Sequence, residues 1–470
     1  MRNIIYIFAI LAGLGLSSCS DEWMGDVIPK DNIGDDDAFK NIKDGQNALN
    51  GIFSMMQHHE YYGAYYLYYG DVKAMDIRTT TIGRRTESEY LFQSTTEASP
   101  YEMWSRPYTC LVNINNAIIN VEEMPTESVK EEQEKLEIQA NFYALRALTH
   151  FDLLKVFSRI PTAQRGDEFD TYGVPLADQV FDVKYEAERA SVEEVYTLIF
   201  SDLAKAKELM PAESNTEGWF NATGVKALAS RANLYHGNYT EAYSLSKEII
   251  DAGSYSLIPY GAYGESWGVK DNSEAILTII NSDSDNASNE GIGYLYSESG
   301  YDAMIPADSF KSLLSSDSND DRNSMITTSG YFAKFPNDLT NNIHLFRLSE
   351  MYLIAAECAI HDDAINKSEA TKYLNELLAV RTDGNTSLTD DQVDLDRVLL
   401  ERRKELVGEG HVYFDYIRNK KDIVRTGDDH FTSAITGKTI EWEDYRIIQP
   451  IPRKELNANS NMIQNPEYAD

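Results

Sequence analysis

Cysteine is scarce in this chain. Only Cys19, Cys110 and Cys358 occur among 470 residues. Cys110 and Cys358 lie in apolar stretches of helical spacing, so we expect two buried thiols, although an exported protein also permits a disulfide between them. No cysteine and histidine spacing matches a structural zinc site. The cysteines therefore predict neither a small fold held by disulfides nor a metal centre.

Positively charged residues are also scarce relative to negatively charged ones. The chain carries 42 Lys and Arg against 76 Asp and Glu, which gives a formal net charge of −34. A protein this acidic is repelled by phosphate backbones and by anionic lipid surfaces. We therefore predict that nucleic acid is not a partner.

Several functional signatures are missing as well. After the first 18 residues, no apolar run is long enough to cross a membrane, and we find no phosphate loop and no dinucleotide fingerprint. His58-His59-Glu60 lacks the i,i+4 histidine pair of a zinc hydrolase, and no nucleophile motif lies beside Glu409-Gly410-His411. We therefore predict no cofactor, no bound metal and no catalytic residue.

The N-terminus has the order of a secretory signal. Arg2 precedes an apolar stretch from Ile4 to Leu16, and Leu16-Ser17-Ser18-Cys19 follows. These last four residues resemble the lipobox of bacterial lipoproteins, in which a peptidase cuts before a cysteine that carries diacylglycerol. An ordinary cleaved signal with an incidental cysteine is the alternative. We predict a signal peptide over residues 1–18 and lipid attachment at Cys19.

A loose acidic segment follows the predicted lipid. Residues 19–37 read as a flexible tether between the membrane and the folded body. Within them, Ser20-Asp21-Glu22 resembles the surface-export signal of some Gram-negative lipoproteins. The sequence therefore favours an outer-membrane protein that is lipid-anchored and faces the cell surface.

Apolar residues recur three and four positions apart over much of the remaining chain, which is typical of helices buried on one face. Residues 252–344 differ, because Gly, Ser, Asn, Asp and Tyr dominate there and short β-type runs such as Ala275–Ile280 are interspersed. We predict a predominantly α fold. A single body over 38–470 would combine a helical scaffold, at about 38–251 and 345–420, with a loop-rich ligand lobe at about 252–344 that has a few short strands.

Parts of the scaffold resemble tetratricopeptide repeats. In Ala232–Ala242, small residues allow two helices to approach, and Gly237 permits a left-handed turn between them. Arg347–Ala359 followed by Ala370–Leu378 looks like a second helix pair. Such pairs stack, because one pair cannot bury its own apolar face.

Longer blocks of the sequence resemble the SusD/RagB family. They include the helix Arg347–Ala359, the segment Leu400–Asp415, and the ending Pro450-Ile451-Pro452. The resemblance runs in order from Cys19 to the C-terminus. It implies stacked tetratricopeptide-like helix pairs that carry an irregular ligand-binding lobe. It also implies an outer-membrane lipoprotein that captures nutrient and caps a SusC-like TonB-dependent transporter. The usual ligands of the family are glycans, and one branch takes peptides.

A sugar presents an apolar C–H face and a ring of hydroxyls, so it needs an aromatic plane with polar groups at its edge. Two stretches of the sequence offer such residues. The expected ligand-binding residues are Tyr65, Tyr66 and Arg84 from the first stretch, and Trp267, Asn286, Tyr294, Tyr296 and Tyr301 from the lobe.

The charged residues of the family blocks have a structural interpretation. Glu401 and Glu405 are four residues apart and flank Arg402 and Arg403, which predicts an ion-paired helix edge that binds a neighbour. Clustered acids at Asp317–Asp321 would suit calcium, but we expect a solvated loop there. A surface glycoside hydrolase and a pure helical-repeat scaffold remain as alternative functions.

Overall fold

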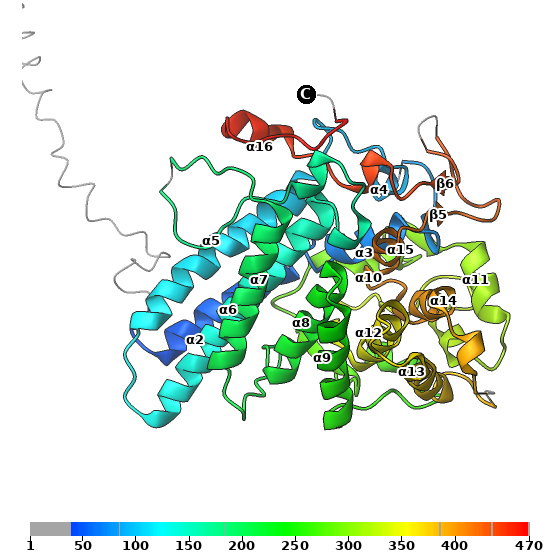
Figure 1. Cartoon of the computed structure of the whole chain (residues 1–470), viewed down its shortest axis with the longest axis horizontal. Helices are drawn as coiled ribbons and strands as arrows, with labels where there is room; N and C mark the ends of the chain where they lie inside the picture. The colour runs from blue at the N-terminus through cyan, green and yellow to red at the C-terminus, as the bar shows by residue number, and fades with distance from the viewer. Residues whose placement is uncertain (1–38, 84, 183, 385–386, 434–435, 469–470) are drawn as a thin grey trace, which may run out of the picture.

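The computed structural model describes residues 39–83, 85–182, 184–384, 387–433 and 436–468 (Figure 1). The predicted signal peptide, Cys19, the tether of residues 19–37 and Arg84 lie outside the described residues. The predominantly α fold is confirmed, and the strands are short.

Long helices form a row across the molecule (Figure 1). α5 packs on α6, α6 on α7, α7 on α8 and α8 on α9, while α2 covers α5 and α6, and α12 joins α9 to α13 and α14. The bounds of these helices are α2 Ile42–Gln57, α5 Tyr101–Glu123, α6 Val129–Phe157, α7 Val192–Leu209, α8 Ala222–His236, α9 Tyr239–Ala252, α12 Leu348–His361, α13 Lys367–Ala379 and α14 Leu395–Leu406.

Local chemistry explains where several of these helices begin and end. Ser191 caps α7 and exchanges hydrogen bonds with Glu194, which is a capping box. Gly237 ends α8 with a φ of 92°, in the left-handed region that glycine adopts without strain. Both features can be predicted from the sequence, where Ser191-Val192-Glu193-Glu194 has the pattern of a capping box and Gly237 permits the turn, and the helix pair α8–α9 is confirmed. In the second pair, the helix begins at Leu348 rather than near residue 345, because Ile343–Arg347 forms strand β4.

Residues 252–344 contain short strands and short helices. Strand β2 (Ala275–Ile279) pairs antiparallel with β4, and β3 (Met304–Pro306) pairs antiparallel with β1 (Ile77–Thr79). Helices α10 (Ile292–Tyr296) and α11 (Asp308–Ser315) lie between the strands. The lobe is therefore attached to the N-terminal part through β1 and to the C-terminal helices through β4.

Short elements complete the fold around this lobe. They are α3 Tyr65–Val72, α4 Glu87–Tyr90, α15 Val412–Arg418, α16 Arg453–Ala458, and the antiparallel pair β5 Ile423–Val424 and β6 Thr439–Ile440. Cys110 and Cys358 are buried free thiols, as predicted. Among the described residues, no helix combines the length and apolarity that a bilayer crossing requires.

Buried His150 makes stability sensitive to acid. Its Nδ1 donates to the Arg146 carbonyl at 3.0 Å, and its Nε2 accepts from the Ala177 amide at 3.1 Å. Burial lowers the pKa of His150 to about 4, whereas an unfolded chain binds a proton near pH 6.5. The neutral ring therefore stabilises the fold fully above about pH 6.5, and this contribution is lost as the pH falls through about 4.

Replacing His150 with Gln should weaken this acid sensitivity, because the amide does not titrate. The stabilisation at stake in the wild type is about 3 kcal/mol over that pH window. Melting temperatures of both proteins, measured near pH 7 and near pH 5, test the assignment. On acidification, the melting temperature of the wild type should fall further than that of His150→Gln. An equal fall in the two proteins would contradict the assignment.

Candidate functional site

Buried ion pairs attach the lobe to the helical scaffold. Arg347, at the end of β4, donates from Nη1 to Glu274 at 2.7 Å and from Nε to Glu409 at 2.7 Å. Arg381, just after α13, donates from Nε to Glu405 of α14 at 2.9 Å and also bonds Glu274. Glu274, Arg347, Arg381 and Glu405 are buried, and the side chain of Glu409 is 7% exposed. We call these five residues the ion lock.

The ion lock supports the structural interpretation of the signature residues. Burial by itself favours the neutral form of Glu405, yet the guanidinium groups of Arg381 and Arg347 hold the pKa of this carboxyl well below its ordinary value. Elsewhere on the same helix, Glu401 pairs with Arg322 at 2.8 Å, and Arg402 pairs with Asp415 at 2.7 Å. These charges are used for packing helices and lobe together.

Trp267 belongs to the packing around the ion lock. It is 3% exposed, so the expectation of an exposed aromatic plane is wrong. Its ring lies 4.4 Å from the Lys334 ammonium and 4.9 Å from the Arg347 guanidinium. Trp267 therefore shields buried cations through cation–π contacts.

Two of the expected tyrosines are core residues. Tyr296 is 1% exposed and its ring packs 5.1 Å from Phe332 and 6.0 Å from Phe335. Tyr66 is 6% exposed, and its hydroxyl donates to the Met103 carbonyl at 2.8 Å. The expectation that these rings are exposed is wrong. In the first stretch, helix α3 and the turn before it bury most of the tyrosines, and Tyr65 is the half-exposed one.

Asn286 organises its own turn. Its Nδ2 donates to the Ser282 carbonyl at 2.6 Å, and its Oδ1 accepts from the Ser288 amide at 2.8 Å. Such bonds from an Asn side chain to nearby backbone are typical of tight turns. The structure therefore gives Asn286 a local structural role on the approach to α10.

Three expected residues do gather at one edge of the lobe. Tyr294 of α10 lies 6.3 Å from Tyr301, measured between ring centroids. Tyr65, at the start of α3, lies close by, because the amide of Ile292 donates to the Gly63 carbonyl at 2.8 Å. All three rings are half-exposed. We call Tyr65, Tyr294 and Tyr301 the tyrosine rim.

A charged pair borders the tyrosine rim. The guanidinium of Arg85 lies 4.0 Å from the centre of the Tyr301 ring and pairs with Glu290. The Tyr301 hydroxyl donates to Glu290 at 2.9 Å, and this bond raises the pKa of Tyr301. Burial, followed by nearby carboxylates that include Glu290, raises the pKa of Tyr65. The rim thus combines apolar ring faces with charged hydrogen-bonding groups.

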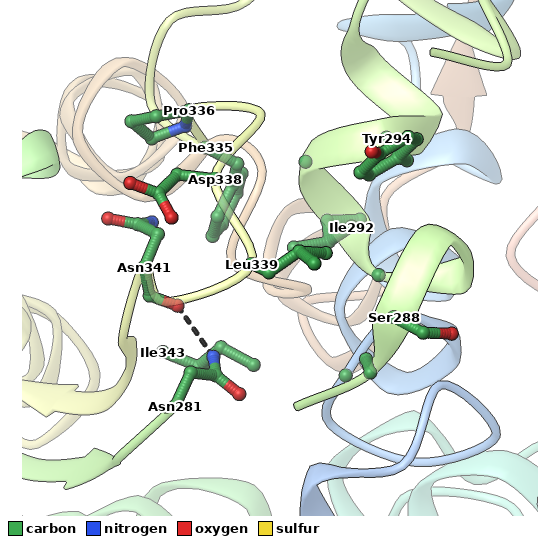
Figure 2. A pocket seen from close by; sticks show the side chains of 14 residues that line it. Asn281, Ser288, Ile292, Tyr294, Phe335, Pro336, Asp338, Leu339, Asn341 and Ile343 are labelled. Atoms are coloured by element: carbon green, nitrogen blue, oxygen red, sulfur yellow. Dashed lines mark hydrogen bonds between the residues drawn. The ribbon is translucent and has the colours of Figure 1, made fainter. Parts of the chain in front are cut away.

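Beneath Tyr294 lies a narrow cleft (Figure 2). Ile292 and Tyr294 form one wall, and Phe335, Leu339 and Asn341 belong to the other. On the second wall, the side-chain amide of Asn281 donates to the Asn341 carbonyl. The free space is about 30 Å³, close to the volume of one water molecule. A sugar ring does not fit inside, so a ligand of that size must bind at the open surface.

A wider depression lies along the turn that follows α10, and Phe335 and Pro336 border both this depression and the cleft. The depression has a volume of about 580 Å³, which is within the range of small-molecule sites. Tyr296, Phe332 and Phe335 line its aromatic side, and its polar side is lined by Ser297, Ser299, Thr327, Ser329, Tyr331 and Asn337. We call this depression the lobe hollow.

The polar residues of the lobe hollow were missed in the sequence. Asn337 donates to both Ser297 and Ser299 at 3.2 Å, so residues 40 and 38 positions apart form one wall. The Tyr331 hydroxyl donates to Asp302 at 3.0 Å, next to the tyrosine rim. Runs of hydroxyl-bearing residues, as in Thr327-Thr328-Ser329, were the available signal, but such runs are common in turns.

One Gly-x-Ser-x-Gly pattern occurs at Gly264–Gly268, and the prediction of a non-catalytic chain overlooked it. Ser266 is 8% exposed, and its hydroxyl donates to the Tyr263 carbonyl at 2.7 Å. It lies in a short 3-10 helix instead of a strand-to-helix elbow. The pattern therefore lacks the geometry of an activated serine.

The acidic stretch Asp317–Asp321 is also different from the expectation. Asp320 is buried and pairs with Arg322 at 2.8 Å and with Lys404 at 3.2 Å. Asp321 accepts the amides of Gly261 and Tyr263. The expected solvated loop is wrong for Asp320, since its oxygens are engaged by cations of the protein.

Comparisons with known proteins identify the family that has this architecture. Two family models match: one described as SusD family over residues 314–468, and one described as starch-binding associating with outer membrane over residues 39–235. A crystal structure of a SusD superfamily protein from Bacteroides thetaiotaomicron is 31% identical, covers 91% of this chain and 100% of its own, and superposes with a TM-score of 0.85. The chain belongs to the SusD/RagB family.

More distant proteins match over most of the chain too. SusD-like protein P38 of Formosa agariphila is 23% identical over 99% of both chains. Surface glycan-binding protein A of Bacteroides thetaiotaomicron, solved with laminarihexaose, is 18% identical, covers 90% of this chain and 99% of its own, and has a TM-score of 0.71. The last comparison shows a shared fold.

Proposed function

We propose that this SusD/RagB protein is a non-catalytic lipoprotein that captures glycan at the cell surface. The observation that carries the proposal is the tyrosine rim beside the lobe hollow. Half-exposed rings offer stacking planes, and the hollow offers hydroxyl and amide groups at its wall. This combination matches the two faces of a sugar.

The proposed ligand is an oligosaccharide. A fold neighbour is described as a surface glycan-binding protein with laminarihexaose, and one matching family model is described as starch-binding. Both descriptions support a carbohydrate over a peptide. Arg84 stays a prediction from the sequence, where it directly precedes Arg85, the residue that borders the tyrosine rim.

Transport completes the proposal. The family model over residues 39–235 is described as associating with the outer membrane, and the sequence before it has the lipobox pattern ending at Cys19. We propose that lipid on Cys19 holds the protein at the outer membrane, facing outward. There it caps a SusC-like TonB-dependent transporter and delivers the captured glycan.

A binding screen tests the proposed function. The purified protein would be titrated with a panel of neutral polysaccharides, their oligosaccharides and mixed peptides, while reducing ends are assayed in parallel. Saturable binding of a glycan without release of reducing ends is the expected result. Sustained release would instead establish a glycoside hydrolase. Binding of peptides alone would assign the chain to the peptide branch, and failure to bind any member would favour a helical scaffold.

A further inference from the structure

We propose that the turn between α2 and α3 binds a divalent transition-metal ion of the Zn²⁺ type, held by His58, His59 and Glu60. Among the residues that the structure describes, these three form the one group of His, Cys, Asp and Glu whose ligand atoms converge closely. Each offers an atom within 4.8 Å of the other two. This proposal departs from the sequence-based prediction of no bound metal, and it does not depend on the proposed glycan binding.

The spacing of the ligand atoms suits one ion. His58 Nδ1 lies 3.3 Å from Glu60 Oε2. Two ligands at about 2.0–2.1 Å from a tetrahedral Zn²⁺ stand roughly 3.3 Å apart. The His59 ring lies next to His58, with centroids 4.2 Å apart and the ring planes tilted by 37°, and one of its nitrogens lies within 4.8 Å of the other two ligand atoms. Imidazole nitrogens favour Zn²⁺ and similar ions over Ca²⁺ and Mg²⁺.

One nitrogen of His58 already faces the cluster. Its Nδ1 lies 3.4 Å from the Glu60 amide, which donates to it, and 3.4 Å from Arg106 Nη2. These two neighbours are donors, whereas the third, Glu60 Oε2 at 3.3 Å, is an acceptor. A metal ion bound by the unprotonated nitrogen of a neutral imidazole would lie between this nitrogen and the Glu60 carboxylate.

The guanidinium of Arg106 now occupies the place beside Glu60 and His58 that a metal ion would take. It donates to Glu60 and approaches His58, so a metal ion must displace its guanidinium. Its side chain is 26% exposed and projects from α5, so it has room to move into solvent. Arg106 is therefore a competitor of the ion. Removing its charge should strengthen metal binding.

The site lies next to the tyrosine rim. The His59 ring contacts Tyr65 edge-to-face, with centroids 5.7 Å apart. Three protein ligands leave a fourth position on the ion for water or another oxygen. An ion in this turn would therefore also fix the position of one ring of the rim.

Calorimetric titration of the full chain, without a polyhistidine tag and after treatment with a chelator, tests the site with Zn²⁺ alone near neutral pH. One ion per chain should bind. His58→Gln and His59→Gln should each weaken the affinity at least about tenfold. Arg106→Gln should tighten it at least about threefold, since a like charge near the ion is removed. A gain of affinity does not arise from misfolding.

His236→Gln is the matched control. His236 Nε2 also contacts a carboxylate, that of Glu193 at 3.0 Å, but without a third ligand, so this change should leave Zn²⁺ binding as in the wild type. Three results would overturn the proposal. They are no saturable binding, an affinity in the His58→Gln, His59→Gln double variant equal to that of the wild type, and weaker binding by Arg106→Gln.

Discussion

Replacing Glu405 with Gln is expected to lower the free energy of unfolding by about 3–5 kcal/mol. The carboxylate is fully buried and bonds Arg381 and Arg347, and Arg322 lies 3.7 Å away. The amide keeps the shape but removes the negative charge, so buried guanidinium groups lose their compensation. The lower stability should appear in both thermal and urea unfolding. The contacts between the lobe and the scaffold should weaken most.

The matched control for this prediction is Glu208→Gln on α7. Glu208 is 68% exposed and pairs with Lys205 at 3.2 Å, so its removal should cost less than about 1 kcal/mol. The folded Glu405→Gln protein should keep its ligand affinity, because no residue of the ion lock lines the lobe hollow or belongs to the tyrosine rim. A Glu405→Gln protein as stable as Glu208→Gln would show that the ion lock does not hold the lobe.

Local features of the fold were well predicted from the sequence. The capping box at Ser191 and the left-handed Gly237 depend on residues a few positions apart, and helical periodicity is equally local. The start of α12 was missed, because Ile343–Arg347 pairs with β2, about 70 residues earlier. Strand pairing of that kind leaves little trace in a short window of sequence.

The site was predicted only in part for a similar reason. Tyr65, Tyr294 and Tyr301 reach one surface, as the composition suggested. Trp267 does not, although its neighbours in sequence are polar, because its partners Lys334 and Arg347 come from distant segments. An aromatic ring among polar residues looks the same in sequence whether it meets a sugar or a buried cation.

The second large effect is expected for ligand binding. Changing Tyr294 and Tyr301 together to Ala should reduce glycan affinity by about 2 kcal/mol, roughly 30-fold in Kd. The two rings are neighbours and half-exposed, so their loss removes two stacking planes from the rim. Tyr260→Ala is the control, since Tyr260 is 47% exposed in the same lobe but lies outside the rim and the lobe hollow.

Titration of the wild type, the Tyr294→Ala, Tyr301→Ala variant and the Tyr260→Ala control with one glycan found in the screen tests the central claim most directly. All three proteins should melt at similar temperatures. We expect tight binding by the wild type and by Tyr260→Ala, and a Kd that is about 30-fold higher for the double variant. Equal affinity in all three would show that the glycan binds elsewhere and would contradict the account.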